Sequence, residues 1–96
     1  MYARVARWEG QDADTLRTIA KRISEESGPP DGVPAKGFMM LMDGDGGRSL
    51  AIALFDTEED MRKGDETLNG MNPPGGSGDG QRVSVEMYEV GVDIRL

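Results

Sequence analysis

The sequence predicts an α+β protein, a two-layer βαββαβ sandwich in which two helices cover one face of a four-stranded antiparallel sheet. Stretches with the two-residue period of strands and the 3.6-residue period of helices alternate in that order along the chain. The two central strand-like stretches flank a glycine-rich turn. Clusters of Gly, Pro and Asp separate the stretches and mark the element ends.

The first strand is expected over Tyr2–Trp8, and its alternation is imperfect. One face carries Ala3 and Val5, and the other carries Tyr2, Arg4, Ala6 and Trp8. Asp12 or Asp14 then caps a helix that is expected to run to about Ser27. The apolar residues of this helix recur at helical spacing: Leu16, Ile19, Ala20 and Ile23. We therefore expect an amphipathic helix that faces the core.

The second and third strands, Gly37–Met42 and Ser49–Phe55, are apolar on both faces. The intervening segment 43–47, Asp-Gly-Asp-Gly-Gly, is similar to the start of a calcium loop. However, the fifth position is Gly47, and the twelfth, where a bidentate Glu belongs, is Leu54. A tight hairpin turn is favoured, because Asp-Gly accommodates positive φ angles.

Asp56 or Thr57 is expected to cap the second helix, whose first turn is acidic and therefore suits the helix dipole. Gly64 lies in its inner stripe and predicts a close approach to the sheet, since Gly costs about 1 kcal/mol against Ala in a helix. The full stripe is Met61, Gly64, Leu68 and Met71. Pro73 and Pro74 are expected to end the helix.

The segment Gly75–Gly80 is predicted to be a flexible connection. It is no phosphate loop, because it lacks the Gly-Lys-Ser/Thr ending and precedes a strand. The last strand is expected from Val83 to about Val90, and the extended tail Gly91–Leu96 continues it.

The composition excludes several classes of function. The 96 residues are expected to form one domain, 1–96, and the net charge of −7 argues against nucleic acid and membranes as partners. The chain has no Cys and no His, which removes thiolate nucleophiles, Ser-His-Asp triads and the usual ligands of zinc and haem. It also lacks a dinucleotide fingerprint. We expect no cofactor, no metal and a cytoplasmic location.

The doubly apolar central strands predict a homodimer. Two helices cover only one face of a four-stranded sheet, so the other face would leave Met, Leu and Phe side chains exposed. A second copy of the chain, packed sheet against sheet, is the most economical cover, and the seven Met residues suit such a surface.

In these features the chain resembles the dimeric α/β barrel superfamily of ferredoxin-like domains. The resemblance covers nearly the whole chain and rests on the element order, on Gly37-Phe38 opening the second strand, on the acidic segment 56–60 and on the doubly apolar sheet. Proteins of this kind include cofactor-independent quinone-forming monooxygenases, haem-degrading monooxygenases and lactone isomerases. The resemblance implies the fold and the dimer.

The catalytic residues known in that superfamily are mostly missing from this chain. Haem degraders combine an Asn and a Trp with an axial His, which this chain lacks. Quinone-forming oxygenases use an Asn and a Trp one helical turn apart on the second helix. In this chain Asn69 and Asn72 lie at the end of the second helix. The residue one helical turn after Asn69 is Pro73, and the only Trp is Trp8, on the first strand.

A polar set on the first and last strands is the main candidate site. By strand parity five side chains are expected to share one sheet face: Tyr2, Arg4, Trp8, Glu86 and Tyr88. Arg4 and Glu86 would pair across the strands. A ligand site in which Arg4 binds an anion is one interpretation, and a polar part of the dimer interface is the favoured one.

A second candidate site, on the helix side of the sheet, is predicted to be apolar and without an acid, base or nucleophile. Its expected lining is Ala3, Val5, Leu16, Ile19, Ile23, Met61, Leu68, Val83, Val85 and Met87. The leading hypothesis is thus a non-catalytic dimeric protein that binds a small apolar or aromatic ligand, or only itself. The alternative is a cofactor-independent monooxygenase of an aromatic, quinol-type substrate, and a third is a ligand-sensing accessory domain.

Overall fold

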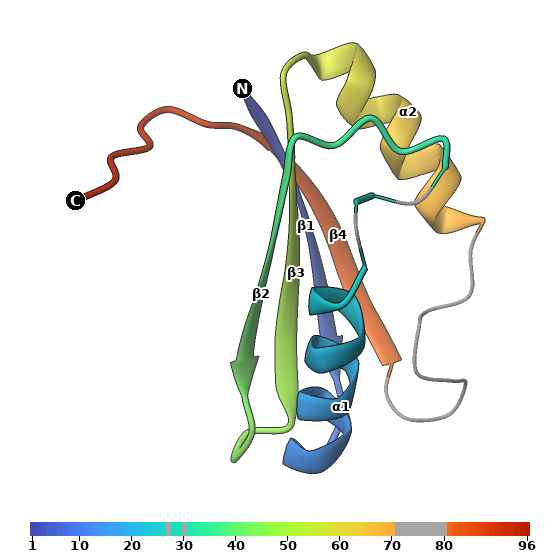
Figure 1. Ribbon diagram of the computed structural model, residues 1–96, viewed down its shortest axis with the longest axis vertical. Helices are drawn as coiled ribbons and strands as arrows, with labels where there is room; N and C mark the ends of the chain where they lie inside the picture. Colours follow the sequence, from blue (N-terminus) through green and yellow to red (C-terminus); the bar gives the residue numbers. More distant parts are fainter. Residues whose placement is uncertain (27, 30, 71–80) are drawn as a thin grey trace.

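The computed structural model describes residues 1–26, 28–29, 31–70 and 81–96. Its elements, in chain order, are β1 (Tyr2–Glu9), α1 (Ala13–Ser24), β2 (Gly37–Asp43), β3 (Arg48–Phe55), α2 (Glu58–Asn69) and β4 (Gln81–Glu89). The strands form one antiparallel sheet in the order β2-β3-β1-β4. Both helices lie on the same side of this sheet (Figure 1). The predicted βαββαβ sandwich is confirmed.

Side-chain caps begin both helices. Asp12 is the cap of α1 and accepts the Thr15 N–H at 2.7 Å, and Thr57 is the cap of α2 and accepts the Asp60 N–H at 3.0 Å. α1 ends at Ser24, slightly before the predicted end. α2 ends at Asn69 with Gly70 as its C-cap, before the end predicted at Pro73 and Pro74. The predicted loop 75–80 lies outside the described residues.

A tight turn joins β2 to β3, as predicted. Asp43 Oδ1 accepts the Gly46 N–H at 3.0 Å, and Asp43 Oδ2 accepts the Arg48 Nε–H at 2.9 Å. These bonds lower the pKa of the Asp43 carboxyl, the Gly46 N–H most strongly. Gly47 closes the turn with φ +66°, a conformation that suits glycine.

The buried cluster around Phe55 lies between the sheet and α2, and Leu16 and Ile19 of α1 are buried as well. Phe55 is fully buried and packs with Val33, Ala53 and Met61. A Cβ atom on Gly64 would lie only 2.6 Å from the Phe55 ring, so α2 approaches the sheet as closely as its glycine allows. The predicted role of Gly64 is thereby confirmed.

The two faces of β1 are the reverse of those predicted. Arg4 lies in register with Met87 on the helix side of the sheet, whereas Val5 lies in register with Glu86 on the open side. Ala3 shares the open side with Val5. The prediction took Ala3 and Val5 as the helix-side face of the strand from its alternation, which left Arg4 on the other face. The partners of Arg4 come from α2, which the pattern of β1 does not reveal.

Candidate functional site

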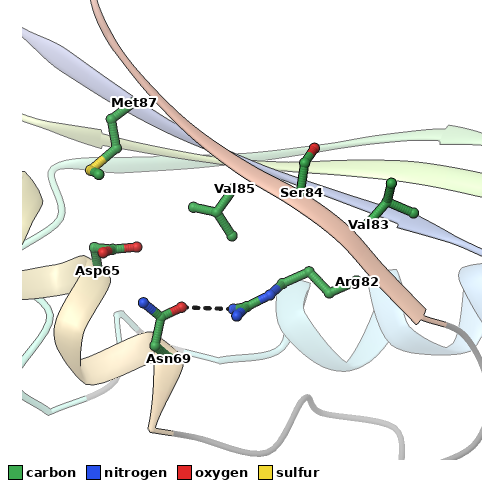
Figure 2. Close-up of a pocket in the computed structure, with 7 residues that line it drawn as sticks. All are labelled: Asp65, Asn69, Arg82, Val83, Ser84, Val85 and Met87. Atoms are coloured by element: carbon green, nitrogen blue, oxygen red, sulfur yellow. Dashed lines mark hydrogen bonds between the residues drawn. The ribbon is translucent and has the colours of Figure 1, made fainter.

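An open cleft of about 340 Å³ lies between α2 and β4 (Figure 2). Its described lining comes from the end of α2 and from β4: Asp65, Asn69, Arg82, Val83, Ser84, Val85 and Met87. Asp65 and Asn69 stand one helical turn apart, so both side chains project from α2 toward β4. The helix and the strand thus supply opposite walls of the cleft.

A hydrogen-bonded network connects three elements at this cleft. Arg4 of β1 donates from Nε to Asp65 Oδ1 at 2.7 Å and from Nη2 to Asn69 Oδ1 at 3.1 Å. Arg82 of β4 donates from Nη1 to the same Asn69 Oδ1 at 2.8 Å, as Figure 2 shows. The amide oxygen of Asn69 therefore bridges two guanidinium groups.

The inner half of this network is sealed from solvent. Arg4 is only 5% exposed, and the side chain of Asp65 is 20% exposed. A buried guanidinium needs a charged or hydrogen-bonding partner, because water no longer solvates it. Arg4 consequently fixes the orientation of Asp65 and Asn69, and with them the helical wall of the cleft.

The described network carries an excess of positive charge. It contains two guanidinium groups, on Arg4 and Arg82, against the single carboxylate of Asp65. The whole chain has a net charge of −7, so this cationic spot contrasts with its surroundings. Of the two charged residues that line the cleft, Asp65 already accepts from Arg4, whereas Arg82 donates only to a neutral amide among the described residues. The cleft therefore favours an anionic group at its Arg82 end.

Three of the five β4 residues that line the cleft are apolar. Val83, Val85 and Met87 alternate along β4 on the side that faces α2, and Val83 and Met87 are 52% and 46% exposed. A few polar groups that converge on an apolar wall are typical of small-molecule sites. The arrangement suits a ligand with a charged end and an apolar body.

The five predicted site residues divide between the two faces of the sheet. Tyr2, Arg4 and Trp8 share the helix-side parity of β1, but only Arg4 joins the cleft network. Glu86 and Tyr88 lie on the open side, where the Tyr88 hydroxyl donates to the Glu86 carboxylate. This bond raises the pKa of Tyr88. The predicted Arg4–Glu86 pair is therefore wrong, because the two side chains project from opposite faces.

Tyr2 and Trp8 have other neighbours. Tyr2 is half-buried and packs against the Phe55 cluster. Trp8 lies in register with Ser49 of β3 and with Arg82 of β4, after an irregularity in the β1–β4 pairing. Trp8 thus stands beside the strand that carries the cleft's cation.

The predicted apolar site on the helix side is also wrong in two respects. The cleft contains Asp65, Asn69 and Arg82, and Ala3 and Val5 of the predicted lining lie on the open side. Asp65 occupies the i+4 position of the stripe that begins at Met61, so a charged residue on the buried side of the helix was the sequence signal for this site. Arg82 had no comparable signal.

Over residues 1–26, 28–29, 31–70 and 81–96, no group of three or more His, Cys, Asp or Glu side chains is placed to hold a metal ion. Neither described helix has the length and apolar character needed to cross a membrane.

Comparison with known proteins finds similarity in structure only. No protein-family model and no curated protein matches the chain. A crystal structure of a mutant of MhuD with two manganese protoporphyrin IX molecules bound per active site has a TM-score of 0.69 at 15% identity, over 99% of both chains. A "putative antibiotic biosynthesis monooxygenase" from Deinococcus radiodurans has a TM-score of 0.55 at 16% identity, over 100% of this chain and 98% of the other. The chain therefore shares its fold, a ferredoxin-like α+β sandwich, with these two proteins.

Proposed function

We propose that the protein binds a small ligand in the cleft between α2 and β4, and that this ligand joins an anionic group to an apolar or aromatic body. One observation carries the proposal: among the described residues, Arg82 is held by the neutral amide of Asn69 and not by a carboxylate. Hydrogen bonds that involve a charged group contribute about 1.5–3 kcal/mol. Arg82 accordingly supplies the anion-binding group of the cleft.

Each wall of the cleft has its own part in binding. The anionic end of the ligand lies against Arg82, while Val83 and Met87 pack against the apolar body. Arg4 stays beneath the cleft and holds Asn69 in place. Ligand binding without catalysis is favoured. Asp65 is the carboxylate in the described lining that could act as an acid or base, but its Oδ1 already accepts a hydrogen bond from Arg4.

A metalloporphyrin, such as the one in the similar MhuD structure, does not fit these residues. The chain has neither His nor Cys for the iron. Among the described residues that line the cleft, Met87 has a side chain that can ligate haem iron. In cytochromes c, however, such a Met acts together with a His, which this chain lacks. We therefore propose no haem chemistry for this cleft.

A direct test uses 8-anilinonaphthalene-1-sulfonate, an anionic aromatic probe, and the neutral N-phenyl-1-naphthylamine. Arg82→Gln should weaken binding of the anionic probe by about tenfold, equivalent to 1.4 kcal/mol, and should leave the neutral probe nearly unchanged. The matched control is Arg17→Gln, on the exposed side of α1. Calorimetric titration measures all four combinations. Equal affinities of the two variants for the anionic probe would refute the proposal.

The second candidate function is cofactor-independent oxidation of an aromatic, quinol-type substrate. Two observations favour it: Asn69 and Asp65 of the second helix face the cleft together, and one similar structure is named as a putative monooxygenase. In such a reaction O₂ converts a ring CH₂ group into C=O, and the second oxygen atom leaves as water with the two hydrogens. The substrate supplies all the electrons, so no external reductant is required.

Oxygen consumption with anthrone tests this alternative. A true activity in the cleft should fall at least about tenfold in Asp65→Asn, which removes the carboxylate but keeps the shape of the side chain. Tyr88→Phe is the control, because Tyr88 lies on the open side of the sheet. Turnover at the buffer rate in the unaltered protein would leave binding as the function.

We further propose that the protein acts as a homodimer, packed through the open side of its sheet. That side carries apolar residues from three strands: Val5, Met39, Leu41, Leu50, Ile52 and Leu54. Met39 and Leu41 are 42% and 45% exposed in the single chain. A contiguous apolar surface of this kind is typical of an interface.

A further inference from the structure

Asn69, whose amide oxygen bridges Arg4 and Arg82, is followed directly by Gly70. The backbone nitrogen that follows an asparagine can attack the side-chain carbonyl carbon, because the two atoms are close in the chain and form a small ring, a succinimide. A glycine permits this attack most readily, since it has no Cβ atom to crowd the ring and its backbone rotates freely. Asn69 and Gly70 are thus a pair in which the amide is easily lost.

The described structure does not require a glycine at position 70. Gly70 is the C-cap of α2 with φ −85° and ψ −5°, a right-handed conformation that most residues adopt. Among the described residues, a Cβ atom there would meet nothing closer than the Thr67 carbonyl oxygen at 3.5 Å. Gly64 differs, because its Cβ atom would collide with the Phe55 ring. What glycine adds at position 70 is the ease of attack on Asn69.

The attacking nitrogen can leave its place at small cost. Asn69 is the last residue of α2, and the Gly70 N–H donates to the Thr67 carbonyl at 3.1 Å. Such a bond at a helix end contributes little to stability, and helix ends open locally more easily than any other part of a helix. Asn69 and Gly70 are both exposed, so water reaches them.

The carbonyl under attack is held in place by two cations. Asn69 Oδ1 accepts from Arg4 Nη2 at 3.1 Å and from Arg82 Nη1 at 2.8 Å, and Figure 2 shows the second of these bonds. During the attack the negative charge develops on this same oxygen. Donors that already face a developing oxyanion stabilise it, and charged donors do so more strongly than neutral ones. The two guanidinium groups therefore lower the barrier to the loss of the amide.

We propose that Asn69 is a self-modification site, at which deamidation places a carboxylate between Arg4 and Arg82 and weakens anion binding in the cleft. The Gly70 nitrogen gives up its proton and forms a bond to Asn69 Cγ. The Cγ–Nδ2 bond then breaks, and the displaced nitrogen takes up a proton and leaves as ammonia. Water opens the resulting succinimide at either of its carbonyls, which gives aspartate or isoaspartate. One water is consumed and one ammonia is released, with no oxidation or reduction.

The product changes the charge of the network. Before the reaction two guanidinium groups face the single carboxylate of Asp65, and afterwards they face two carboxylates. Arg82 then has a charged partner of its own, and an anionic ligand has to compete with it. This effect on the cleft rests on the proposed function, whereas the deamidation depends only on Asn69 and its neighbours.

The first experiment follows the charge of the protein by ion-exchange chromatography during incubation at neutral and at mildly alkaline pH. A species with one additional negative charge should accumulate, faster at the higher pH because the attacking nitrogen must lose its proton. Peptide mapping should assign the change to Asn69, since the other asparagine, Asn72, precedes Pro73, whose nitrogen carries no hydrogen. Asp-Gly pairs such as Asp43-Gly44 can isomerise through a similar ring, but their charge stays the same. A constant charge, or a change at another residue, overturns the proposal.

Variants separate the part of the backbone from that of the side chains. Gly70→Ala should slow the reaction at least about tenfold, because its Cβ atom hinders the attack. Arg82→Met should slow it at least about threefold, because one of the two donors to the developing oxyanion is lost. The matched control is Arg17→Met, on the exposed side of α1, which should leave the rate unchanged. A rate in Arg82→Met that equals or exceeds that of the unaltered protein overturns the proposal.

The second experiment measures the effect on the cleft by calorimetric titration. Asn69→Asp has the side chain of the aspartate product, and it should weaken binding of 8-anilinonaphthalene-1-sulfonate at least about fivefold while binding N-phenyl-1-naphthylamine nearly as before. Lys63→Gln, on the exposed side of α2, changes the net charge by the same amount and should bind both probes like the unaltered protein. Unaltered protein that has been incubated to full conversion gives the same comparison without a substitution.

The outcomes distinguish this proposal from the proposed function. Equal affinities of Asn69→Asp and Lys63→Gln for the anionic probe overturn the effect of the modification on the cleft. Freshly purified protein that does not bind the anionic probe refutes the proposed function, and the chromatography still decides whether Asn69 is modified.

Discussion

Arg4 of β1 and Asp65 of α2 lie 61 residues apart in sequence and meet through a 2.7 Å contact between Nε and Oδ1. This ion pair is the one direct charge contact between sheet and helix among the described residues, and it lies beneath the proposed ligand cleft. It ties the position of α2 to the centre of the sheet. Its loss should therefore affect both the stability of the fold and the shape of the cleft.

Removal of one partner of this pair should destabilise the protein strongly. Asp65→Leu should lower the free energy of unfolding by about 3 kcal/mol, because it leaves the Arg4 guanidinium buried without its carboxylate. Glu58→Ala, which breaks the exposed Glu58–Arg62 pair on the same helix, should lower it by less than about 1 kcal/mol. Urea denaturation measures both. Similar losses in the two variants would show that the Arg4–Asp65 pair is not effectively buried.

The same residue also tests the corrected faces of β1. Arg4→Met and Glu86→Gln should have additive effects on the free energy of unfolding, within about 0.5 kcal/mol, because the two side chains lie on opposite sides of the sheet. Arg4→Met and Asp65→Leu should be non-additive by more than that amount. A coupling between Arg4 and Glu86 as large as the one with Asp65 would contradict the register of β1 and β4.

Gly64 should not tolerate a methyl group. Gly64→Ala gains up to about 1 kcal/mol of helix propensity, but its Cβ would lie 2.6 Å from the buried Phe55 ring. Overpacking of this kind costs about 1–3 kcal/mol, so a net loss is expected. Gly70→Ala, at the end of the same helix, meets nothing closer than 3.5 Å and should be neutral or slightly stabilising. Thermal unfolding compares the two; a stable Gly64→Ala protein would indicate a looser helix–sheet contact.

The β2–β3 turn should make stability depend on pH. The Gly46 N–H and the Arg48 guanidinium lower the pKa of Asp43 below its ordinary value of 3.8. Because the folded pKa is the lower one, the stabilisation is fully present above 3.8 and is lost as the pH falls through the folded pKa. Asp43→Asn should therefore reduce the difference in unfolding free energy between about pH 6 and about pH 2. Asp45→Asn, in the same turn, is the control. If it reduced the pH dependence of the unfolding free energy as much as Asp43→Asn does, the effect would come from the loss of one negative charge and not from the hydrogen bonds of Asp43.

The homodimer can be tested on the open side of the sheet. Light scattering should give about twice the chain mass of 10.4 kDa at micromolar concentration. Leu41→Glu should shift the protein toward the monomer, because it places a charge in the apolar interface. Lys63→Glu, on the exposed side of α2, should leave the mass unchanged. A monomeric unaltered protein would refute the proposed interface.

Much of the fold is predictable because its signals are local. The periodicity of a strand or helix depends on residues within one or two turns, and the caps at Asp12 and Thr57 act three residues along the chain. Gly64 also has a local signature, since a glycine in an apolar helical stripe indicates close packing. The element order, the turn at Asp43–Gly47 and the approach of α2 to the sheet followed from such signals.

The candidate site was less predictable, because its side chains meet only through the tertiary fold. The sequence by itself determined that Arg4 would sit in a strand and Asp65 in a helix, each with one side facing the core. Only the tertiary structure decided that Arg4 faces inward, since the desolvation of its guanidinium is offset by Asp65 and Asn69 from a helix 61 and 65 residues away. A strand's own alternation contains no information about a partner that distant, so the faces of β1 and the polar cleft depend on the packing of α2 against the sheet.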